Sequence, residues 1–332
     1  MNILLQNLLL PLNQYLTDPC ISDISINQPG EVWIDDGTKI QCLLNSDLNF
    51  NRCLAITQQI ATFSEQTINE QHPLLSAHLP NGERIQIILN PATLWIDDQN
   101  KVATTIALSI RKLQTTHHKL ETYVAQGGFS LVGQSATNAQ QHLETIKELK
   151  SKKKYMELLR YAILNKQTVL VSGATYSGKT SFLNMLVQEI PLRERIITIE
   201  DVPELQVPHP NRVRLFYSRG SQGRALIQAS DLVLATLRMR PDRIILGELR
   251  GDDAIHWLTA ANSGHPGTLA TIHADEPMMA LEKLILMVMA SQPGLSREAI
   301  YRYVTRIVKI IVQLKRNPAG LRYVADILLI NE

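Results

Sequence analysis

The chain has 332 residues, of which 45% are hydrophobic and 19% are charged, and its formal net charge is +2. This length is typical of about two domains, and the near-neutral charge argues against a chain that binds nucleic acid through a strong basic excess. The three cysteines, Cys20, Cys42 and Cys53, form no C-x-x-C pair, so free thiols in a reducing cytoplasm are expected rather than a zinc site or a disulfide framework.

The first predicted element is the apolar segment MNILLQNLLLPL at the N-terminus. It lacks the basic start and the A-x-A cleavage site of a signal peptide, and it is far shorter than the roughly 20 apolar residues of a membrane span. A packing helix is predicted here, and the alternative is contact with a membrane surface or a partner protein. The longest apolar run elsewhere, residues 284–290, is also too short to span a membrane. We therefore expect a soluble protein, cytoplasmic if it uses ATP.

Residues 1–130 are predicted to form a smaller α+β domain. Strand patterns occur in four segments, residues 22–26, 32–35, 84–89 and 104–111, and a helical pattern occurs in residues 56–63. The pattern breaks at Gly127-Gly128, and a linker is predicted over residues 131–154. The linker contains the run Lys152-Lys153-Lys154, for which a solvated face is the simpler interpretation and contact with nucleic acid the alternative.

Residues 155–332 alternate between helix and strand patterns. The strands are predicted at residues 168–172, 195–200, 243–246 and 268–273. The helices are predicted at residues 155–164, 180–189, 228–239 and 252–262, followed by a helical C-terminal part. Such alternation predicts an α/β domain with a mainly parallel sheet that helices cover on both faces.

The stretch VSGATYSGKT, residues 171–180, has the spacing of a phosphate-binding loop between a strand and a helix. In such a loop glycines let backbone N–H groups face the phosphates, the lysine reaches the terminal phosphates, and the hydroxyl after it binds Mg²⁺. Lys179 and Thr180 fill the last two roles. The loop residues predicted to bind ATP are Gly173, Ala174, Thr175, Tyr176, Ser177, Gly178, Lys179, Thr180 and Ser181. Tyr176 is unusual in a loop that favours small residues, so a decayed site is the alternative.

Acidic residues follow two further strands, as ATP hydrolysis requires for the metal ion and the attacking water. Glu200 and Asp201 end the segment ERIITIED, and Glu248 follows DRIILG. We assign Glu200 to the orientation of the water and Glu248 to Mg²⁺ through a water molecule, with Asp201 beside the nucleotide. The reverse assignment of the two glutamates stays open.

Histidines and arginines complete the predicted site. His265 and His273 flank the strand in SGHPGTLATIH and are suited to sensing the γ-phosphate. Charge on the transferred phosphoryl group must also be neutralised. The candidates are Arg250, after the second acidic strand, and Arg84 and Arg111, at strand ends in the N-terminal domain.

Six co-linear segments carry a family resemblance: LPNGERIQIIL, SIRK, GATYSGKT, ERIITIEDVPEL, LRMRPDRIILGELRGDDA and SGHPGTLATIHA. They resemble the secretion-superfamily traffic ATPases, and within that superfamily the hexameric ATPase of type IV secretion systems. The resemblance implies a RecA-like P-loop ATPase core that uses ATP and Mg²⁺. It also implies that GELR is an atypical Walker B motif, and that Arg84 and Arg111 reach the phosphates from the N-terminal domain.

The resemblance further implies a homohexameric ring, peripheral on the cytoplasmic face of the bacterial inner membrane. Such a ring works with inner-membrane channel components and drives pilus assembly and the export of protein or DNA. The near-neutral charge leads us to expect no stable binding of nucleic acid by the chain itself.

Two residues depart from the family pattern: Tyr176 stands where glycine is usual, and Asp253 where glutamate is common. No cysteine follows Cys53, which argues against the type II secretion ATPases with their four-cysteine zinc module. The alternatives left open are an assembly ATPase of a tight-adherence or type IV pilus, and an ATP-binding ring component that hydrolyses weakly. A helicase would need a basic groove with stacking aromatics, but aromatics make up only 5% of the chain.

Overall fold

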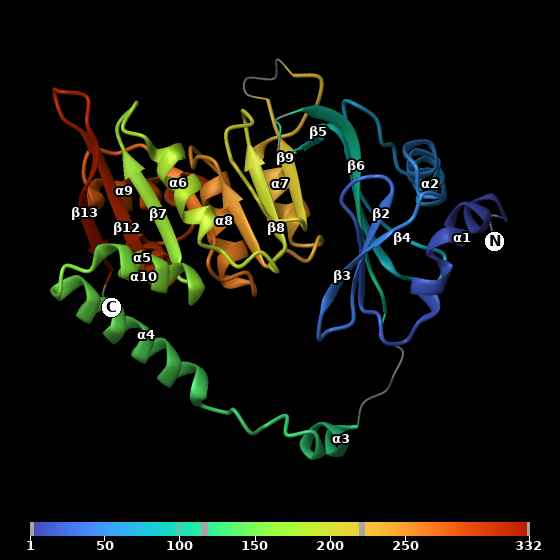
Figure 1. Ribbon diagram of the computed structural model, residues 1–332, viewed down its shortest axis with the longest axis horizontal. Helices are drawn as coiled ribbons and strands as arrows, with labels where there is room; N and C mark the ends of the chain where they lie inside the picture. Colours follow the sequence, from blue (N-terminus) through green and yellow to red (C-terminus); the bar gives the residue numbers. More distant parts are fainter. Residues whose placement is uncertain (1–2, 98, 100, 114–118, 219–222, 331–332) are drawn as a thin grey trace.

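The computed structural model describes residues 3–97, 99, 101–113, 119–218 and 223–330, without the side chains of residues 134–138. Figure 1 shows an N-terminal body, in blue and teal, beside a C-terminal body, in green to red, with a long connection below both. The C-terminal body is a mainly parallel sheet between helices, and the smaller N-terminal body is α+β. This arrangement confirms the predicted fold class.

The N-terminal body is an antiparallel sheet covered by helices α1 (Ile3–Thr17) and α2 (Phe50–Phe63). Its strands are β1 (Asp23–Ile26), β2 (Glu31–Asp35), β3 (Ile40–Leu44), β4 (Leu74–His78), β5 (Arg84–Ile96) and β6 (Val102–Arg111). They lie in the order β4-β5-β6-β1-β2-β3. Helix α1 buries Leu5, Leu9 and Leu12 at helical spacing, which confirms the predicted packing helix.

The C-terminal body is built on the parallel sheet. Its strands are β7 (Thr168–Gly173), β8 (Ile196–Glu200), β9 (Arg212–Phe216), β10 (Arg243–Leu246), β11 (Leu269–Ile272), β12 (Val308–Arg316) and β13 (Arg322–Leu329). Their order is β13-β12-β7-β11-β10-β8-β9, and the terminal strand β13 runs antiparallel to β12. Every residue of β7, β8, β10 and β11 is buried, as expected of a sheet that is covered on both faces.

Helices cover the two faces of this sheet. They are α5 (Tyr155–Leu164), α6 (Lys179–Gln188), α7 (Ala229–Thr236), α8 (Asp253–Asn262), α9 (Pro277–Ser291) and α10 (Arg297–Ile307). Side chains of α5 and α6 share a core with Val169, whereas side chains of α7 to α10 share a core with Leu170. Because successive strand residues point to opposite faces, these two cores lie on opposite sides of β7.

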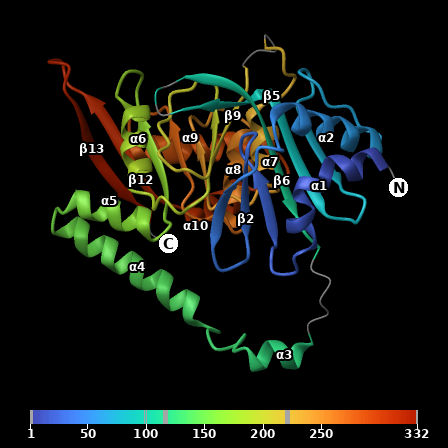
Figure 2. The ribbon, with the colours of Figure 1, turned by 45° about the vertical axis from the view of Figure 1, so that its right-hand side comes forward.

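The connection between the bodies contains α3 (Leu120–Ala125) and α4 (Gln134–Ser151). Helix α4 packs on the C-terminal body, where Ile146 is buried and His142 Nδ1 lies 2.8 Å from the Tyr161 hydroxyl. Helix α3 lies away from both sheets in Figures 1 and 2. Lys152, Lys153 and Lys154 are exposed. The predicted boundaries at residues 130 and 154 stay a prediction.

The last part of the chain differs from the prediction of a helical C-terminal part. Helices α9 and α10 are present, but residues 308–329 form β12 and β13, and β12 pairs with β7. The run VKIIVQL is rich in β-branched residues, and a short apolar run of this kind does not distinguish a buried strand from a buried helix. Strands β3, β4 and β9 were also missed by the sequence patterns.

The two bodies meet along β5 and β9. Thr93 pairs with Leu215 across the junction, and the fully buried Arg195 donates to Asn27 Oδ1 over 2.6 Å. Burial lowers the pKa of Arg195 to about 10. A buried guanidinium is expensive to leave without its partners, so this cluster holds the N-terminal body against the C-terminal sheet.

Candidate nucleotide site

The phosphate loop joins β7 to α6 at the carboxyl edge of the parallel sheet. Gly178, which precedes α6, has a φ of 92°, a left-handed conformation that favours glycine. At Gly173 a Cβ atom would lie 2.3 Å from Ser177 Oγ and 2.8 Å from the carbonyl oxygen of Leu314. The tight loop therefore presents the unpaired N–H groups at the start of α6, which is a favourable place for an anion.

Tyr176 adopts the backbone conformation that explains why glycine is usual at this position. Its φ is 62°, a left-handed conformation that costs a non-glycine residue about 1–2 kcal/mol. The side chain is 77% exposed. The tyrosine ring thus lies in solvent at the rim of the loop.

Lys179 is buried and bonded to its own loop. Its ammonium group donates to the carbonyl oxygens of Gly173 and Ala174 over 2.9 and 3.0 Å. Burial lowers the pKa of Lys179. A phosphate group that arrived here would offer the ammonium a charged acceptor in place of two neutral ones.

His273 connects this lysine to the second acidic residue. Its Nδ1 lies 3.1 Å from Lys179 Nζ, and its Nε2 lies 3.2 Å from Glu248 Oε1. Glu248 also pairs with Arg250. One imidazole therefore stands between the lysine of the phosphate loop and the carboxylate at the end of β10.

Glu200 is buried at the end of β8, with 1% of its surface exposed. Arg214 donates hydrogen bonds to both carboxylate oxygens of Glu200, from Nε to Oε1 over 3.0 Å and from Nη2 to Oε2 over 2.9 Å. The Thr198 hydroxyl donates to Oε1 over 2.7 Å, and the Leu205 N–H donates to Oε2 over 2.9 Å. This carboxylate is thus fixed in place by four donors.

These groups surround a cavity of about 640 Å³ at the carboxyl edge of the sheet. The predicted site residues that line it are Thr175, Tyr176, Gly178, Lys179, Thr180, Ser181, Glu200, Asp201, Glu248, Arg250 and His273. Ser177 Oγ is buried beside it and has no hydrogen-bond partner. The cavity combines a helix start, a lysine, hydroxyls and carboxylates, and this donor set fits a nucleoside triphosphate with Mg²⁺.

The structure does not bring His265 to this cavity. His265 precedes β11 and His273 follows it, so the strand separates them and they lie at opposite edges of the sheet. His265 Nδ1 lies 2.8 Å from the carbonyl oxygen of Pro241, and burial lowers the pKa of His265. Of these two histidines, His273 is the one that contacts Lys179.

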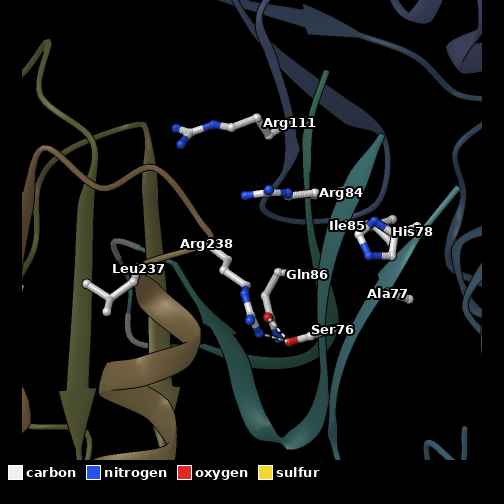
Figure 3. A pocket seen from close by; sticks show the side chains of 9 residues that line it. All are labelled: Ser76, Ala77, His78, Arg84, Ile85, Gln86, Arg111, Leu237 and Arg238. Carbon is white, nitrogen blue, oxygen red and sulfur yellow. Dashed lines mark hydrogen bonds between the residues drawn. The ribbon is translucent and has the colours of Figure 1, made fainter. Parts of the chain in front are cut away.

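Arg84 and Arg111 also lie away from the phosphate loop. They are cross-strand partners on β5 and β6 and line a separate cavity of about 390 Å³ with Arg238. Figure 3 shows the three side chains at the space between β5 and the end of α7. Arg111 Nε lies 2.9 Å from Asp23 Oδ1, and Arg238 Nη1 donates to Ser76 Oγ over 2.8 Å.

Asp253, which stands where the family favours glutamate, supports the turn after Glu248. It is buried at the start of α8, and its Oδ1 accepts the Gly251 N–H over 2.7 Å. Burial raises the pKa of Asp253 to about 6. Its side chain holds the backbone that carries Arg250.

Some lining residues were not predicted. Arg322, from the C-terminal strand pair, reaches the phosphate loop, since a Cβ atom at Gly178 would lie 2.8 Å from Arg322 Cδ. Asn184 and Thr271 line the same cavity. Arg322 follows no recognisable motif, and only the pairing of β12 with β7 brings it here.

The parallel sheet, the phosphate loop and the acids at neighbouring strand ends define a P-loop nucleoside triphosphatase with a RecA-like core. The family model for type II/IV secretion system proteins matches residues 8–319. The chain belongs to this family and, within it, is a type IV secretion ATPase.

Its relatives agree in length and in fold. The type IV secretion system protein VirB11 of Bartonella henselae is 38% identical over 319 residues, covering 92% of this chain and 87% of the relative. VirB11 of Brucella suis is 37% identical over 310 residues, covering 92% and 82%. The crystal structure of the VirB11 ATPase from the Brucella suis type IV secretion system, in complex with sulphate, superposes with a TM-score of 0.87 at 36% identity, covering 98% and 94%. These matches favour the type IV secretion ATPase over the pilus-assembly alternative.

Among the residues that the structure describes, no helix has the length and apolarity to cross a membrane.

Proposed function

We propose that this protein is the ATP-hydrolysing motor of a type IV secretion system, working as a homohexameric ring that drives pilus assembly and the export of protein or DNA. The observation that carries the proposal is the cavity in which Lys179, His273 and Glu248 are linked at the phosphate loop. The names of the relatives support the secretion role.

The phosphate loop and the two glutamates have different roles in the cavity. The loop binds the phosphates through its N–H groups and Lys179. Glu248 at β10 lies nearer to the loop than Glu200 at β8, because the strand order is β7-β11-β10-β8 and strands are about 4.8 Å apart. This order supports Glu248 as the acid beside the metal and Glu200 as the acid that orients the attacking water.

Mg²⁺ would be held by the Thr180 hydroxyl and, through water, by Glu248, and when bound it would neutralise charge on the phosphates. His273 touches both Lys179 and Glu248, so we assign it to sensing the γ-phosphate. Asp201 and Arg250 line the cavity, so we assign them to contacts with the bound nucleotide.

Arg84 and Arg111 serve the nucleotide of an adjacent copy. They lie on the N-terminal body in a cavity apart from the phosphate loop of their own chain. In a ring with head-to-tail contacts, each subunit presents one surface to the next subunit's opposite surface. An arginine pair at such a contact can neutralise the transferred phosphoryl group in trans.

The ring associates with the cytoplasmic face of the inner membrane and with channel components of the secretion system. The exposed Ile3, Leu4 and Leu10 of α1 offer an apolar surface for such contacts. No stable contact with nucleic acid is part of the proposal.

Replacement of the phosphate-loop lysine tests the function. Lys179→Ala should abolish ATP turnover and secretion, because the ammonium group that meets the phosphates is lost. Lys152→Ala, at an exposed lysine of the linker, is the control and should keep parental turnover. Normal turnover in Lys179→Ala would exclude this cavity as the ATPase site.

The two glutamates are distinguished in the same assay. Glu200→Gln should bind ATP and hydrolyse it very slowly. If Glu248→Gln shows this behaviour instead, the two acids exchange roles.

A further inference from the structure

The guanidinium of Arg214 is the charge partner of the buried Glu200. Arg214 stands opposite Thr198 in the register of β8 and β9, so its side chain shares a face with Thr198 and Glu200. It binds both carboxylate oxygens side by side. Its own exposed fraction is 7%, and that of Glu200 is 1%.

The ion pair between Arg214 and Glu200 also fixes the orientation of the carboxylate. A two-point arginine contact fixes the plane of a carboxylate, which a lysine cannot do. The ring of Phe216, two residues further along β9, lies 5.5 Å from the Arg214 guanidinium carbon. Arg214 is absent from the walls of the nucleotide cavity and lines a separate hollow with Ile96 and Asp97. The ion pair with Glu200 connects Arg214 to that cavity.

The strand that carries Arg214 also carries the junction between the bodies. The hydroxyl of Thr93, on β5, donates a hydrogen bond to the backbone carbonyl oxygen of Arg214 over 3.0 Å. Arg212, two residues earlier, donates to the Ile96 carbonyl and lies over the Trp95 ring. A shift of the N-terminal body against the sheet therefore acts on β9, and it also acts on Arg195, directly before β8.

We propose that Arg214 is a positioning residue for ATP hydrolysis: it orients the Glu200 carboxylate, and it transmits the docking of the N-terminal body to that carboxylate through β9. The proposal rests on the role of Glu200 in the proposed function. Of the four donors to Glu200, the Thr198 hydroxyl can rotate away about a single bond, which frees one acceptor position for a water. The two hydrogen bonds from Arg214 to Glu200 do not depend on the orientation of this hydroxyl.

The first test compares steady-state ATP hydrolysis of full-length Arg214→Gln, Arg214→Lys and Arg243→Lys over a range of ATP concentrations, with Mg²⁺. Arg214→Gln should lower kcat by about 30-fold or more with little change in KM. Arg214→Lys keeps the charge but cannot fix the plane of the carboxylate, so its kcat should also stay below that of the parent.

Arg243→Lys is the matched control, because Arg243 is also buried and also binds both oxygens of a glutamate, Glu194, outside the walls of the nucleotide cavity. It should keep the parental kcat. A parental kcat in both Arg214 variants would overturn the proposal, as would an equal loss in Arg243→Lys.

A double mutant separates positioning from folding. In the Glu200→Gln background, Arg214→Gln should add less than about a twofold loss, because two residues that act as one unit are not additive. A further loss as large as in the parent overturns the proposal. If Glu200→Gln is slow while Arg214→Gln is parental, this inference alone fails. If Glu200→Gln is itself parental while Lys179→Ala is inactive, the role of Glu200 is wrong and the inference falls with it.

The link to the N-terminal body is tested with two buried hydroxyls. Thr93→Val removes the donor to Arg214, whereas Thr105→Val removes a hydroxyl that donates within the N-terminal body, to Asn27, over 3.4 Å. Thr93→Val should lower kcat severalfold at unchanged KM, and Thr105→Val should not. Equal kcat values in the two variants would contradict transmission through β9.

Discussion

At the scale of single residues, the site shows how a departure from a family pattern is absorbed. Tyr176 occupies a left-handed position in the phosphate loop, and its side chain is 77% exposed at the rim of the cavity. We therefore expect the backbone strain to affect the stability of the loop more than ATP turnover.

Replacement by glycine measures that cost. Tyr176→Gly should raise the free energy of unfolding by about 0.5–1 kcal/mol, because removal of the left-handed strain outweighs the greater backbone entropy of glycine in the unfolded chain. Turnover should stay within a few-fold of the parent. Thermal unfolding and steady-state hydrolysis check both values.

A large gain in turnover would instead mean that the tyrosine restrains the motor. Tyr176→Ala serves as the control, because it removes the ring but keeps the strained backbone, and its stability should stay close to that of the parent.

At the scale of elements, strands and loops with a local sequence motif could be predicted, whereas elements that depend on tertiary contacts could not. Glu200 and Glu248 were predictable because apolar runs followed by acidic residues are strong local signals, and Lys179 was predictable from the glycine spacing of the phosphate loop. Strand β9 was not, since RVRLF holds two arginines that are buried only by pairing with Glu200 and the N-terminal body. Propensity gives no sign of such a tertiary partner.

The C-terminal strand pair is the clearest case of tertiary context. Strand β12 covers one edge of β7, the strand that leads into the phosphate loop. The carbonyl oxygen of Leu314, on β12, packs against Gly173, and the side chain of Arg322, on β13, packs against Gly178. The pair is thus part of the nucleotide site, although it lies about 130 residues from the loop in sequence.

Truncation tests this role. A chain that ends at residue 307 would leave β7, all of whose residues are buried in the intact protein, as an exposed edge strand, and such edges are prone to aggregation. We expect an insoluble product. Arg322→Ala is the point control, because it keeps both strands and should remain soluble with weaker nucleotide binding. A soluble, monodisperse and active truncated chain would contradict the assignment.

At the scale of the whole molecule, the charged residues predicted for the site are divided between two places. The phosphate loop, the two acids and His273 occupy the carboxyl edge of the sheet, whereas Arg84 and Arg111 line the cavity with Arg238. The sequence predicted which residue types the site requires, but it could not predict that one chain keeps them apart. Their separation follows from the strand order, with β5 and β6 beyond β9.

Mixing of inactive variants tests whether the two places meet between copies. Arg111→Ala should lower turnover far more than nucleotide affinity, and Lys179→Ala should be inactive. In a mixed ring, a site with an intact lysine from one subunit and an intact arginine from the next forms at random in about one case in four. An equimolar mixture should therefore recover about a quarter of parental turnover.

A mixture of Arg84→Ala with Arg111→Ala is the matched control. Both changes affect the same contributing surface, so no subunit in that mixture supplies an intact arginine pair, and turnover should stay at the level of the separate variants. If the mixture of Lys179→Ala and Arg111→Ala also stays inactive, the arginines do not act in trans. A change of docking within one chain would then be needed to bring them to its own phosphate loop, and the polar cluster around Arg195 would have to open first.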